Sequence, residues 1–307
     1  MAEQRAGRPG SGLPGLPPEV TARLEAAGLV AADVAALVQT ALAEDLAGGA
    51  DVTTGATVHP DTSGSADLAA RSAGVVAGLP VAAAVFRLGP AGDQITATFP
   101  ANDGDRVAPG QPVLTVTGRV SPILTAERTA LNLLCHLSGI ATLTRQFVDA
   151  VAGTGAKIRD TRKTVPGMRA LQKYAVRCGG GVNHRMSLSD AALVKDNHVA
   201  AAGSVSAAFA AVRAAAPGLP VEVECDTLDQ VAEALGAGAD LILLDNFSVD
   251  ELAAAVRLTA GRAKLEASGR ITLGTARAIA QTGVDYLAVG ALTHSAPVLD
   301  IGLDLQE

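Results

Sequence analysis

Basic side chains are concentrated in one part of this 307-residue chain. Between residues 157 and 195 the sequence holds only two acidic residues but nine basic ones: Lys157, Arg159, Arg162, Lys163, Arg169, Lys173, Arg177, Arg185 and Lys195. This segment therefore carries a net charge of +7, and the rest of the chain carries −14, which together give −7. A run of charge is commonly a solvated face. Here the bases are interleaved with apolar residues and glycine, which indicates a concave site for an anion.

Three stretches of this segment have the residue types that bind carboxylates or phosphates. The first, residues 159–164, reads RDTRKT and supplies guanidinium groups, which bind carboxylates through two parallel hydrogen bonds, and a compact ammonium. The second is a glycine run, residues 179–181, that precedes His184 and Arg185 and lets backbone approach a ligand closely. In the third, Lys195 follows an apolar segment, where its charge requires an anionic ligand or Asp196 nearby.

Acidic and small residues follow the later apolar segments. Glu224 and Asp245 end two of them, in VEVE and LILLD. Such a pair can hold Mg²⁺, bind ribose hydroxyls, stabilise a developing cation or form salt bridges to the basic segment, and the spacing leaves these alternatives open. The last two segments end in Ser268-Gly269 and Gly290-Ala291. This is the position at which β/α barrels commonly bind phosphate through backbone N–H groups.

Six short apolar segments would position these side chains. Each is typical of a buried parallel strand, and the predicted strand ends are Asp160, Lys195, Glu224, Asp245, Ser268 and Gly290. Helical patterns separate the later segments, so the sequence predicts alternating β/α units and a parallel sheet. Because polar residues fall at the ends of six successive strands, a β/α barrel is favoured over a doubly wound sheet, which binds ligands only near a switch point.

The first half of the chain has a different pattern. A helix is predicted over residues 34–46, followed by short antiparallel strands and turns over 52–117, and Ser121-Pro122 predicts the start of a long helix that runs to Val151. Eight Gly or Pro residues among the first 18 indicate disorder. We therefore predict a disordered leader over residues 1–30, an N-terminal domain over 31–135 and a barrel domain over 136–307, whose C-terminal segment can pack back on the N-terminal domain.

Composition excludes several classes of protein. With 49% hydrophobic and 18% charged residues and a mean hydropathy of +0.30, the chain is not mainly disordered. No apolar run approaches the roughly 18 residues of a membrane span, and the N-terminus lacks the layout of a signal peptide. The negative net charge and 2% aromatic residues argue against a nucleic-acid surface. Three widely spaced cysteines predict reduced thiols and a cytoplasmic location.

Several motifs resemble those of the quinolinate phosphoribosyltransferase family. They are TAERTALNLLCHLSGIAT, KIRDTRKTVPGMRALQKYAVRCGGGVNHR, LVKDNH, VEVE, LILLDN, LEASG and YLAVGALTHS, and the resemblance covers about residues 34 to 305. It implies an α/β protein in which an N-terminal α/β sandwich domain packs on an open, incomplete α/β barrel, arranged as a homodimer. It also implies that quinolinate and phosphoribosyl pyrophosphate are converted, with Mg²⁺, to nicotinate mononucleotide, pyrophosphate and CO₂.

The same resemblance implies a role for each site residue. Arg162, His184, Arg185 and Lys195 would hold the two quinolinate carboxylates, with help from Thr161. Lys163 would lie beside the pyrophosphate or substrate anions, Glu224 and Asp245 would contact the ribose hydroxyls or the metal, and Arg128 would reach into the partner subunit's site. The expected 5′-phosphate loop contains Ser268, Gly269, Arg270, Gly290 and Ala291, and Arg270 departs from the family, which has a small residue there. Lys163, Lys195, Glu224 and Asp245 are the expected catalytic residues.

Three other functions compete with this one. A homologue of the same fold is associated with molybdenum transport, and a related transferase would use nicotinate without decarboxylation. Nicotinate has one carboxylate fewer and should need fewer bases than this chain supplies. The stretch GDRVAPGQPVLTV resembles a biotinyl or lipoyl carrier hairpin, but it has no Lys to carry the cofactor.

Overall fold

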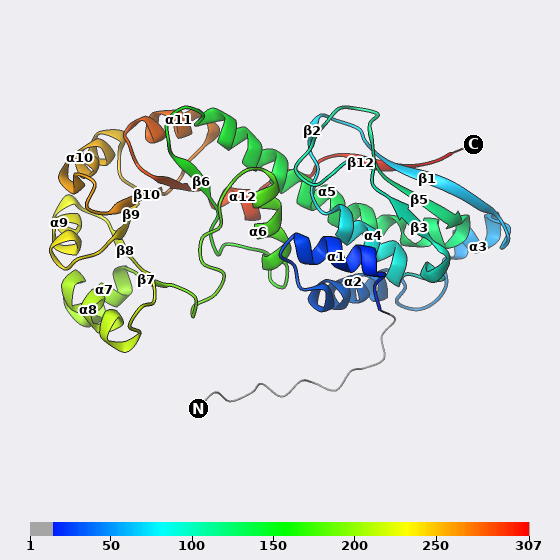
Figure 1. Cartoon of the computed structure of the whole chain (residues 1–307), viewed down its shortest axis with the longest axis horizontal. Helices are drawn as coiled ribbons and strands as arrows, with labels where there is room; N and C mark the ends of the chain where they lie inside the picture. Colours follow the sequence, from blue (N-terminus) through cyan, green and yellow to red (C-terminus); the bar gives the residue numbers. More distant parts are fainter. Residues whose placement is uncertain (1–14, 307) are drawn as a thin grey trace.

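The computed structural model of the chain describes residues 15–306, which form two α/β parts side by side (Figure 1). The prediction of a disordered leader is wrong for residues 18–26, because these form helix α1 (Pro18–Ala26). Pro18 stands at the first helical position, where its missing N–H costs nothing. Val20 and Leu24 lie one turn apart and are both buried, so one face of α1 packs on the core. The prediction for residues 1–14 lies outside the described residues.

The N-terminal part is built on a four-stranded antiparallel sheet. Its strand order is β12-β1-β5-β3, with bounds Ile301–Leu305, Ser63–Ala70, Pro112–Arg119 and Thr96–Thr98. A two-stranded ribbon joins β2 (Gly74–Val75) to β4 (Arg106–Val107). Because β12 is the last strand of the chain and pairs Ile301 with Ala70, the C-terminal segment returns to the N-terminal part.

Besides α1, this part contains α2 (Ala31–Asp45), α3 (Val52–Thr57), α4 (Leu79–Leu88) and the 3₁₀ helix η1 (Gly92–Gln94). Of these helices only α2 was predicted. The expectation of strands and turns alone over 52–117 is therefore wrong at α3 and α4. Residues 79–86 of α4 are all buried, so this helix is apolar all round and lacks the polar–apolar period that marks a helix in a sequence.

A long helix, α5 (Val120–Ala150), joins the two parts. It begins at Val120, two residues before Pro122, the predicted first helical residue, so Ser121 is not its cap, and it ends one residue before Val151. Gly139 stands in its middle, and a Cβ atom there would overlap the carbonyl oxygen of Pro297 and lie 2.8 Å from Cα of Val298. The glycine is thus what allows the segment that leads into β12 to cross α5 so closely.

The C-terminal part contains the six predicted strands in one parallel sheet. The order is β6-β11-β10-β9-β8-β7, with bounds Lys157–Arg159, Tyr286–Ala288, Lys264–Ser268, Leu241–Asp245, Val221–Cys225 and Ala192–Val194. Each strand ends within two residues of its predicted end. Since β6 and β7 are the two edges, the barrel is open, as the resemblance implied.

Five helices lie on the outer face of this sheet (Figure 1), namely α7 (Asp196–Ala202), α8 (Val205–Ala215), α9 (Leu228–Gly236), α10 (Val249–Thr259) and α11 (Leu273–Gln281). Helix α6 (Arg169–Cys178) and the short α12 (Ala291–His294) lie toward the N-terminal part and pack on α5. Several of these helices begin with a capping side chain. For example, Ser248, the N-cap of α10, accepts a hydrogen bond from the backbone N–H of Glu251. Among the described residues, no single helix is long and apolar enough to cross a membrane, and two sharply bent helix pairs reach that length and composition only jointly.

The strand register stacks the inward-facing side chains in layers. Ser268 at the end of β10 pairs with Asp245 on β9 and Ala288 on β11. Two residues earlier, Glu266 pairs with Leu243 and Tyr286. Alternate residues of a strand point to the same face, so a layer of interior side chains lies directly beneath the predicted site residues.

Candidate active site

Nine of the predicted site residues line one cavity of about 400 Å³ at the carboxyl ends of the barrel strands. They are Thr161, Arg162, Lys163, His184, Arg185, Lys195, Glu224, Asp245 and Ser268. Leu193, Leu243, Glu266 and Ala288 complete the lining. The loop after β6, the loop after α6 and the ends of β7 to β10 thus meet at a single site, as expected for the functional rim of an α/β barrel.

The basic side of this cavity is short of acidic partners. Arg162 and Arg185 form no ion pair with any described residue. Nε of Arg162 is buried and has no hydrogen-bond partner. Burial, followed by the repulsion of Arg162, lowers the pKa of Arg185. Two guanidinium groups held close together without neutralising acids form a site for a ligand with more than one negative charge.

The opposite side carries the two predicted acids. Glu224 forms an ion pair with Lys195, so the carboxylate that neutralises Lys195 within the protein is Glu224 and not Asp196, one of the two alternatives that the sequence left open. Asp245 accepts a hydrogen bond of 2.7 Å from the side-chain amide of Asn246. Of the alternatives that the sequence left open for the two acids, a salt bridge to the basic segment is therefore formed by Glu224. Asp245 has no ion-pair partner among residues 15–306.

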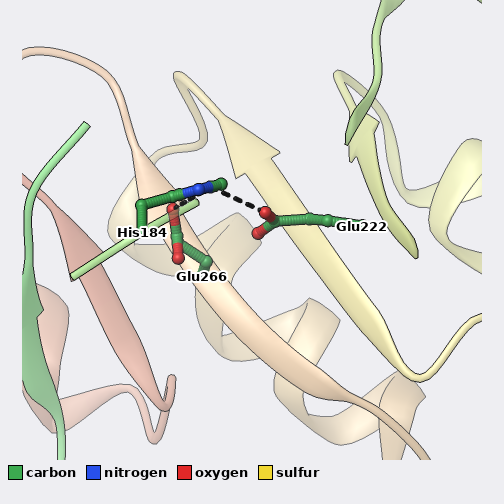
Figure 2. A group of neighbouring side chains, drawn as sticks. All are labelled: His184, Glu222 and Glu266. Carbon is green, nitrogen blue, oxygen red and sulfur yellow. Dashed lines mark ion pairs between the residues drawn. The ribbon is translucent and has the colours of Figure 1, made fainter. Parts of the chain in front are cut away.

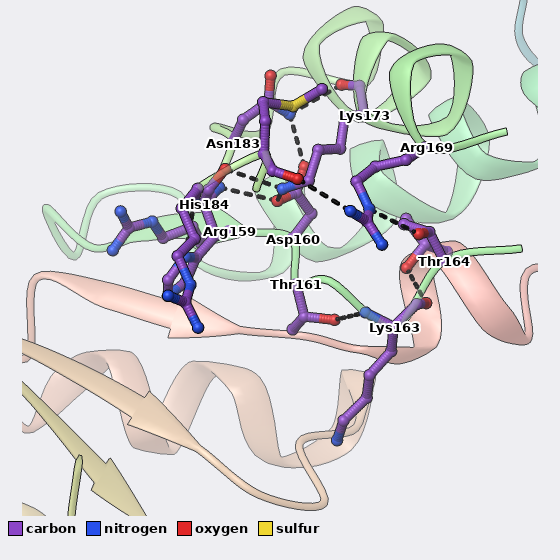
Figure 3. A network of polar contacts seen from close by, with 12 residues as sticks. Arg159, Asp160, Thr161, Lys163, Thr164, Arg169, Lys173, Asn183 and His184 are labelled. Atoms are coloured by element: carbon purple, nitrogen blue, oxygen red, sulfur yellow. Dashed lines mark hydrogen bonds and ion pairs between the residues drawn. The ribbon is translucent and has the colours of Figure 1, made fainter. Parts of the chain in front are cut away.

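A buried network fixes the two basic loops to each other (Figure 3). At its centre Asp160 forms an ion pair with Lys173 of α6, and both side chains are fully buried. Asp160 also accepts hydrogen bonds from the side-chain amide of Asn183 (2.5 Å) and the backbone N–H of His184 (2.8 Å). Lys173 donates to the carbonyl of His184 at 2.8 Å. In contrast, the Lys163 side chain extends away from this network.

His184 lies between the network and a pair of interior carboxylates (Figure 2). Its Nδ1 accepts a hydrogen bond of 2.7 Å from the backbone N–H of Arg185, so the ring donates from Nε2, which lies 2.8 Å from Oε2 of Glu222 and 3.7 Å from Oε1 of Glu266. Both ring nitrogens are thus already hydrogen-bonded within the protein. The expected contact of His184 with a quinolinate carboxylate stays a prediction.

Arg159 supplies the positive charge of this interior layer. Its Nη1 is 2.5 Å from Glu266 and 4.0 Å from Glu222. Burial alone would lower the pKa of Arg159, but the two carboxylates outweigh it and the pKa is raised. His184, Glu222 and Glu266 have the spacing of a metal site. We do not assign a metal to them, because Arg159 already pairs with Glu266 and the Nε2–H of His184 already faces Glu222.

Sequence reasoning missed Glu222 and Glu266 and grouped Arg159 with the bases expected to bind an anion, whereas Arg159 pairs with Glu266. A signal for the interior position of all three was present. Arg159, Glu222 and Glu266 each stand two positions before a predicted site residue, namely Thr161, Glu224 and Ser268. A charged residue inside an otherwise apolar strand, in phase with a residue at the strand end, must face the same interior.

The remaining predicted residues do not line the cavity. Arg128 on α5 lines a separate cavity of about 510 Å³ with Asp300 and Val298. Gly269 has φ of +98°, and a Cβ there would lie 2.8 Å from Cγ of Asn246. Arg270, where a small residue was expected, adopts φ of +49°, which is strained for a residue with a Cβ.

Gly290 and Ala291 lie at the start of α12, beside the cavity. A Cβ on Gly290 would be 3.2 Å from Cδ of Lys163 and 3.2 Å from Nε2 of His294. The absence of a side chain at Gly290 therefore keeps space next to Lys163.

Solved structures show which class of protein has this fold. NadC from Streptococcus pyogenes is 44% identical and superposes with a TM-score of 0.85 over 91% of this chain and 99% of that one. The nicotinate-nucleotide pyrophosphorylase from Francisella tularensis is 39% identical, with a TM-score of 0.86 over 90% and 96%. Human nicotinic acid phosphoribosyltransferase, at 15% identity and a TM-score of 0.56 over 79% and 70%, shares the fold alone. The architecture is therefore that of a pyridine-nucleotide phosphoribosyltransferase.

Sequence comparison identifies the family. The model of the quinolinate phosphoribosyl transferase N-terminal domain matches residues 51–138, and that of its C-terminal domain matches residues 140–304. A carboxylating nicotinate-nucleotide pyrophosphorylase of Mycobacterium leprae is 56% identical over 271 residues, which cover 87% of this chain and 95% of that protein. A probable enzyme of the same name in Bacillus subtilis is 42% identical and covers 82% and 87%. The chain belongs to the quinolinate phosphoribosyltransferase family.

Proposed function

We propose that this protein transfers the phosphoribosyl group of phosphoribosyl pyrophosphate to quinolinate and releases pyrophosphate and CO₂, giving nicotinate mononucleotide for NAD synthesis. The observation that carries the proposal is the cavity itself. It has unneutralised guanidinium groups on one side and the carboxylates of Glu224 and Asp245 on the other. The basic side complements a dianionic acceptor, and the acidic side complements a sugar that becomes cationic during transfer.

Quinolinate is bound on the basic side. Its two neighbouring carboxylates accept hydrogen bonds from Arg162 and Arg185, which line the cavity and have no ion-pair partner among residues 15–306. Thr161, Lys195 and His184 line the same cavity. Nicotinate has a single carboxylate and would leave one of these guanidinium groups without a partner, so the cavity favours quinolinate.

Phosphoribosyl pyrophosphate occupies the other side. Glu224 and Asp245 bind its ribose hydroxyls, and Lys163, whose side chain extends away from the buried network, binds the pyrophosphate. The 5′-phosphate is bound by Ser268 together with the loops that contain Gly269, Arg270, Gly290 and Ala291. The space beside Gly290 and the positive φ of Gly269 support this placement, because both let backbone approach an anion.

Mg²⁺ is the proposed cofactor, and the residues present fit it. Glu224 and Asp245 offer hard carboxylate oxygens at the cavity rim, and Mg²⁺ commonly takes one or two protein carboxylates plus substrate phosphates. When bound, the ion would neutralise the charge of the departing pyrophosphate.

Chemistry in this cavity depends on position and charge. The pyridine nitrogen attacks C1 of the ribose as the bond to pyrophosphate breaks, and positive charge develops on C1 and the ring oxygen. Glu224 and Asp245 stabilise this charge, while Lys163 stabilises the pyrophosphate. Once the ring nitrogen is quaternary, the adjacent 2-carboxylate leaves as CO₂ and the cationic ring takes up its electron pair. The resulting carbanion at C2 then takes a proton.

The active form is a homodimer in the cytoplasm. Arg128 does not line its own subunit's cavity, which supports its contribution to the site of a second copy. All three cysteines are unpaired, as a reducing compartment requires.

A direct assay tests the proposal. The protein is incubated with phosphoribosyl pyrophosphate, Mg²⁺ and either quinolinate or nicotinate, and nicotinate mononucleotide and CO₂ are both measured. Equal amounts of product and CO₂ with quinolinate, and no turnover with nicotinate, are expected. Turnover with nicotinate alone, or with neither, would refute the proposal.

A further inference from the structure

A buried amide on α6 joins three separate segments of the chain. The side chain of Gln172 is fully buried, and no step of the proposed reaction uses it. Its Oε1 accepts a hydrogen bond of 2.9 Å from the backbone N–H of Val165, in the loop after β6. Its Nε2 donates to the carbonyl of Thr293 in α12 at 3.0 Å and lies 2.9 Å from Nε2 of His136 on α5. The amide therefore has a partner in each segment, which is how a buried polar group holds its neighbours in one arrangement.

Thr293 makes a second connection between the same loop and α12. It is buried, and its hydroxyl donates to the backbone carbonyl of Lys163 at 2.8 Å. The side chain of Lys163 also passes close to the start of α12, because a Cβ on Gly290 would lie 3.2 Å from its Cδ. Residues 163–165 are thus held against α12 through a backbone N–H, by Gln172, and through a backbone carbonyl, by Thr293.

These two segments have little regular structure of their own. Lys163 and Val165 are exposed and belong to no helix or strand. Helix α12 has only four residues and no side-chain cap, and Leu292 is its one buried apolar side chain. The position of such short segments depends on a few specific contacts more than on regular packing. The hydrogen bonds of Gln172 and Thr293 are contacts of this kind.

The next residue of α6 serves the other half of the site. Lys173 forms its ion pair with Asp160 and donates to the carbonyl of His184, so it holds the loop in which Arg185 follows. The partners of Gln172 lie instead in the loop of Lys163 and in α12. Adjacent residues of one helix therefore hold the segments expected to bind different substrates.

We propose that Gln172, together with Thr293, is a positioning residue for phosphoribosyl pyrophosphate and sets the distance between the Lys163 ammonium and the start of α12. The inference rests on the proposed function, which places the pyrophosphate beside Lys163 and the 5′-phosphate beside Gly290 and Ala291. Both phosphate groups belong to one substrate molecule, so they bind together only when the two subsites are correctly spaced. Gln172 touches neither group and acts through the segments that it joins.

The test compares the KM values of the two substrates in Gln172→Met, which keeps the length of the side chain and removes its hydrogen bonds. The loop stays attached in this variant, because Nε of Arg169 donates to the Thr164 hydroxyl at 3.0 Å. With saturating quinolinate and Mg²⁺, the KM for phosphoribosyl pyrophosphate should rise at least about tenfold. The KM for quinolinate, measured with saturating phosphoribosyl pyrophosphate, should stay close to the wild-type value.

Ser138→Ala is the control for a loss of stability alone. The buried Ser138 hydroxyl on α5 accepts from the N–H of Ala77 at 3.0 Å and donates to its carbonyl at 3.2 Å, in the N-terminal part. Its removal should lower the free energy of unfolding without changing either KM. An unchanged KM for phosphoribosyl pyrophosphate in Gln172→Met, or an equal rise of both KM values, would refute the inference.

A second pair of variants tests the same junction if Gln172→Met fails to fold. Thr293→Val keeps the shape of the side chain and removes the hydroxyl that donates to Lys163, whereas Thr293→Ser keeps the hydroxyl. The KM for phosphoribosyl pyrophosphate should rise in Thr293→Val and stay near the wild-type value in Thr293→Ser. Equal KM values in these two variants would overturn the inference. Absence of any turnover with quinolinate in the wild type would refute the proposed function instead.

Discussion

At the residue scale, some cations of the basic segment are neutralised by acidic residues of the protein and others are not. Arg159 and Lys173 have buried carboxylate partners within the protein. Arg162 and Arg185 line the cavity and have none among residues 15–306. Arg159 and Lys173 therefore stabilise the folded structure, whereas Arg162 and Arg185 are available to bind an anionic ligand. Single substitutions should separate these two roles.

Replacement of Arg162 by Ala should weaken quinolinate binding strongly. It removes a bidentate carboxylate contact whose loss leaves a substrate charge unpaired, which costs about 3–5 kcal/mol. We expect kcat/KM for quinolinate to fall by more than about a hundredfold, with little change in the KM for phosphoribosyl pyrophosphate. Arg106→Ala is the matched control, because Arg106 forms an exposed ion pair with Asp149. An unchanged KM for quinolinate in Arg162→Ala would contradict the assigned role.

Replacement of Asp160 by Asn should instead lower stability. It leaves the fully buried Lys173 without its carboxylate, and breaking a buried ion pair from one side costs about 3–5 kcal/mol. The free energy of unfolding in urea measures the effect. Asp149→Asn removes the acid of an exposed pair and should cost at most about 1 kcal/mol. Equal losses of unfolding free energy in the two variants would show that the buried ion pair stabilises the fold no more than the exposed one.

At the scale of elements, the sequence predicted segments that have a helical period or a polar end and missed a buried helix that has neither. The six barrel strands were found because each is a short apolar run with a polar end, and α2 and α5 because their apolar residues recur at helical spacing. Helix α4 is buried on all sides, and its run of Val, Ala and Phe carries no period to read. The interior charges Glu222 and Glu266 needed the strand register, which the structure supplies.

The crossing of α5 by the segment that leads into β12 gives a prediction at this scale. Gly139→Ala would normally favour a helix by about 0.5–1 kcal/mol, but here the new methyl group overlaps the Pro297 carbonyl. We expect a net loss of at least about 1 kcal/mol in unfolding free energy. Gly236→Ala on α9, where a Cβ meets nothing within 4 Å, should be neutral or stabilising. A stabilised Gly139→Ala protein would show that the crossing can move aside.

At the scale of the whole molecule, the predicted site residues do not all lie at one cavity of a single chain, and Arg128 is the one that lines a different cavity. The barrel supplies the cavity from its own loops and strand ends, whereas Arg128 lies on α5 beside another cavity, near Asp300. A sequence motif gives the identity of such a residue but not the subunit on which it acts. The contribution of Arg128 to a second copy, which the resemblance implies, stays a prediction; the structure shows only that Arg128 lines a different cavity.

Mixing two inactive variants tests whether the site is shared. Arg128→Ala lacks the residue contributed to the partner, and Lys195→Ala lacks one in its own barrel. Random exchange of equal amounts makes half of the dimers mixed, and each mixed dimer has one intact site, so activity should recover to about a quarter of the wild-type value. Lys195→Ala mixed with Arg162→Ala is the control, because both changes damage the subunit's own barrel and no intact site can form. Recovery in the control, or none in the first mixture, would contradict a site completed by Arg128 of a second subunit.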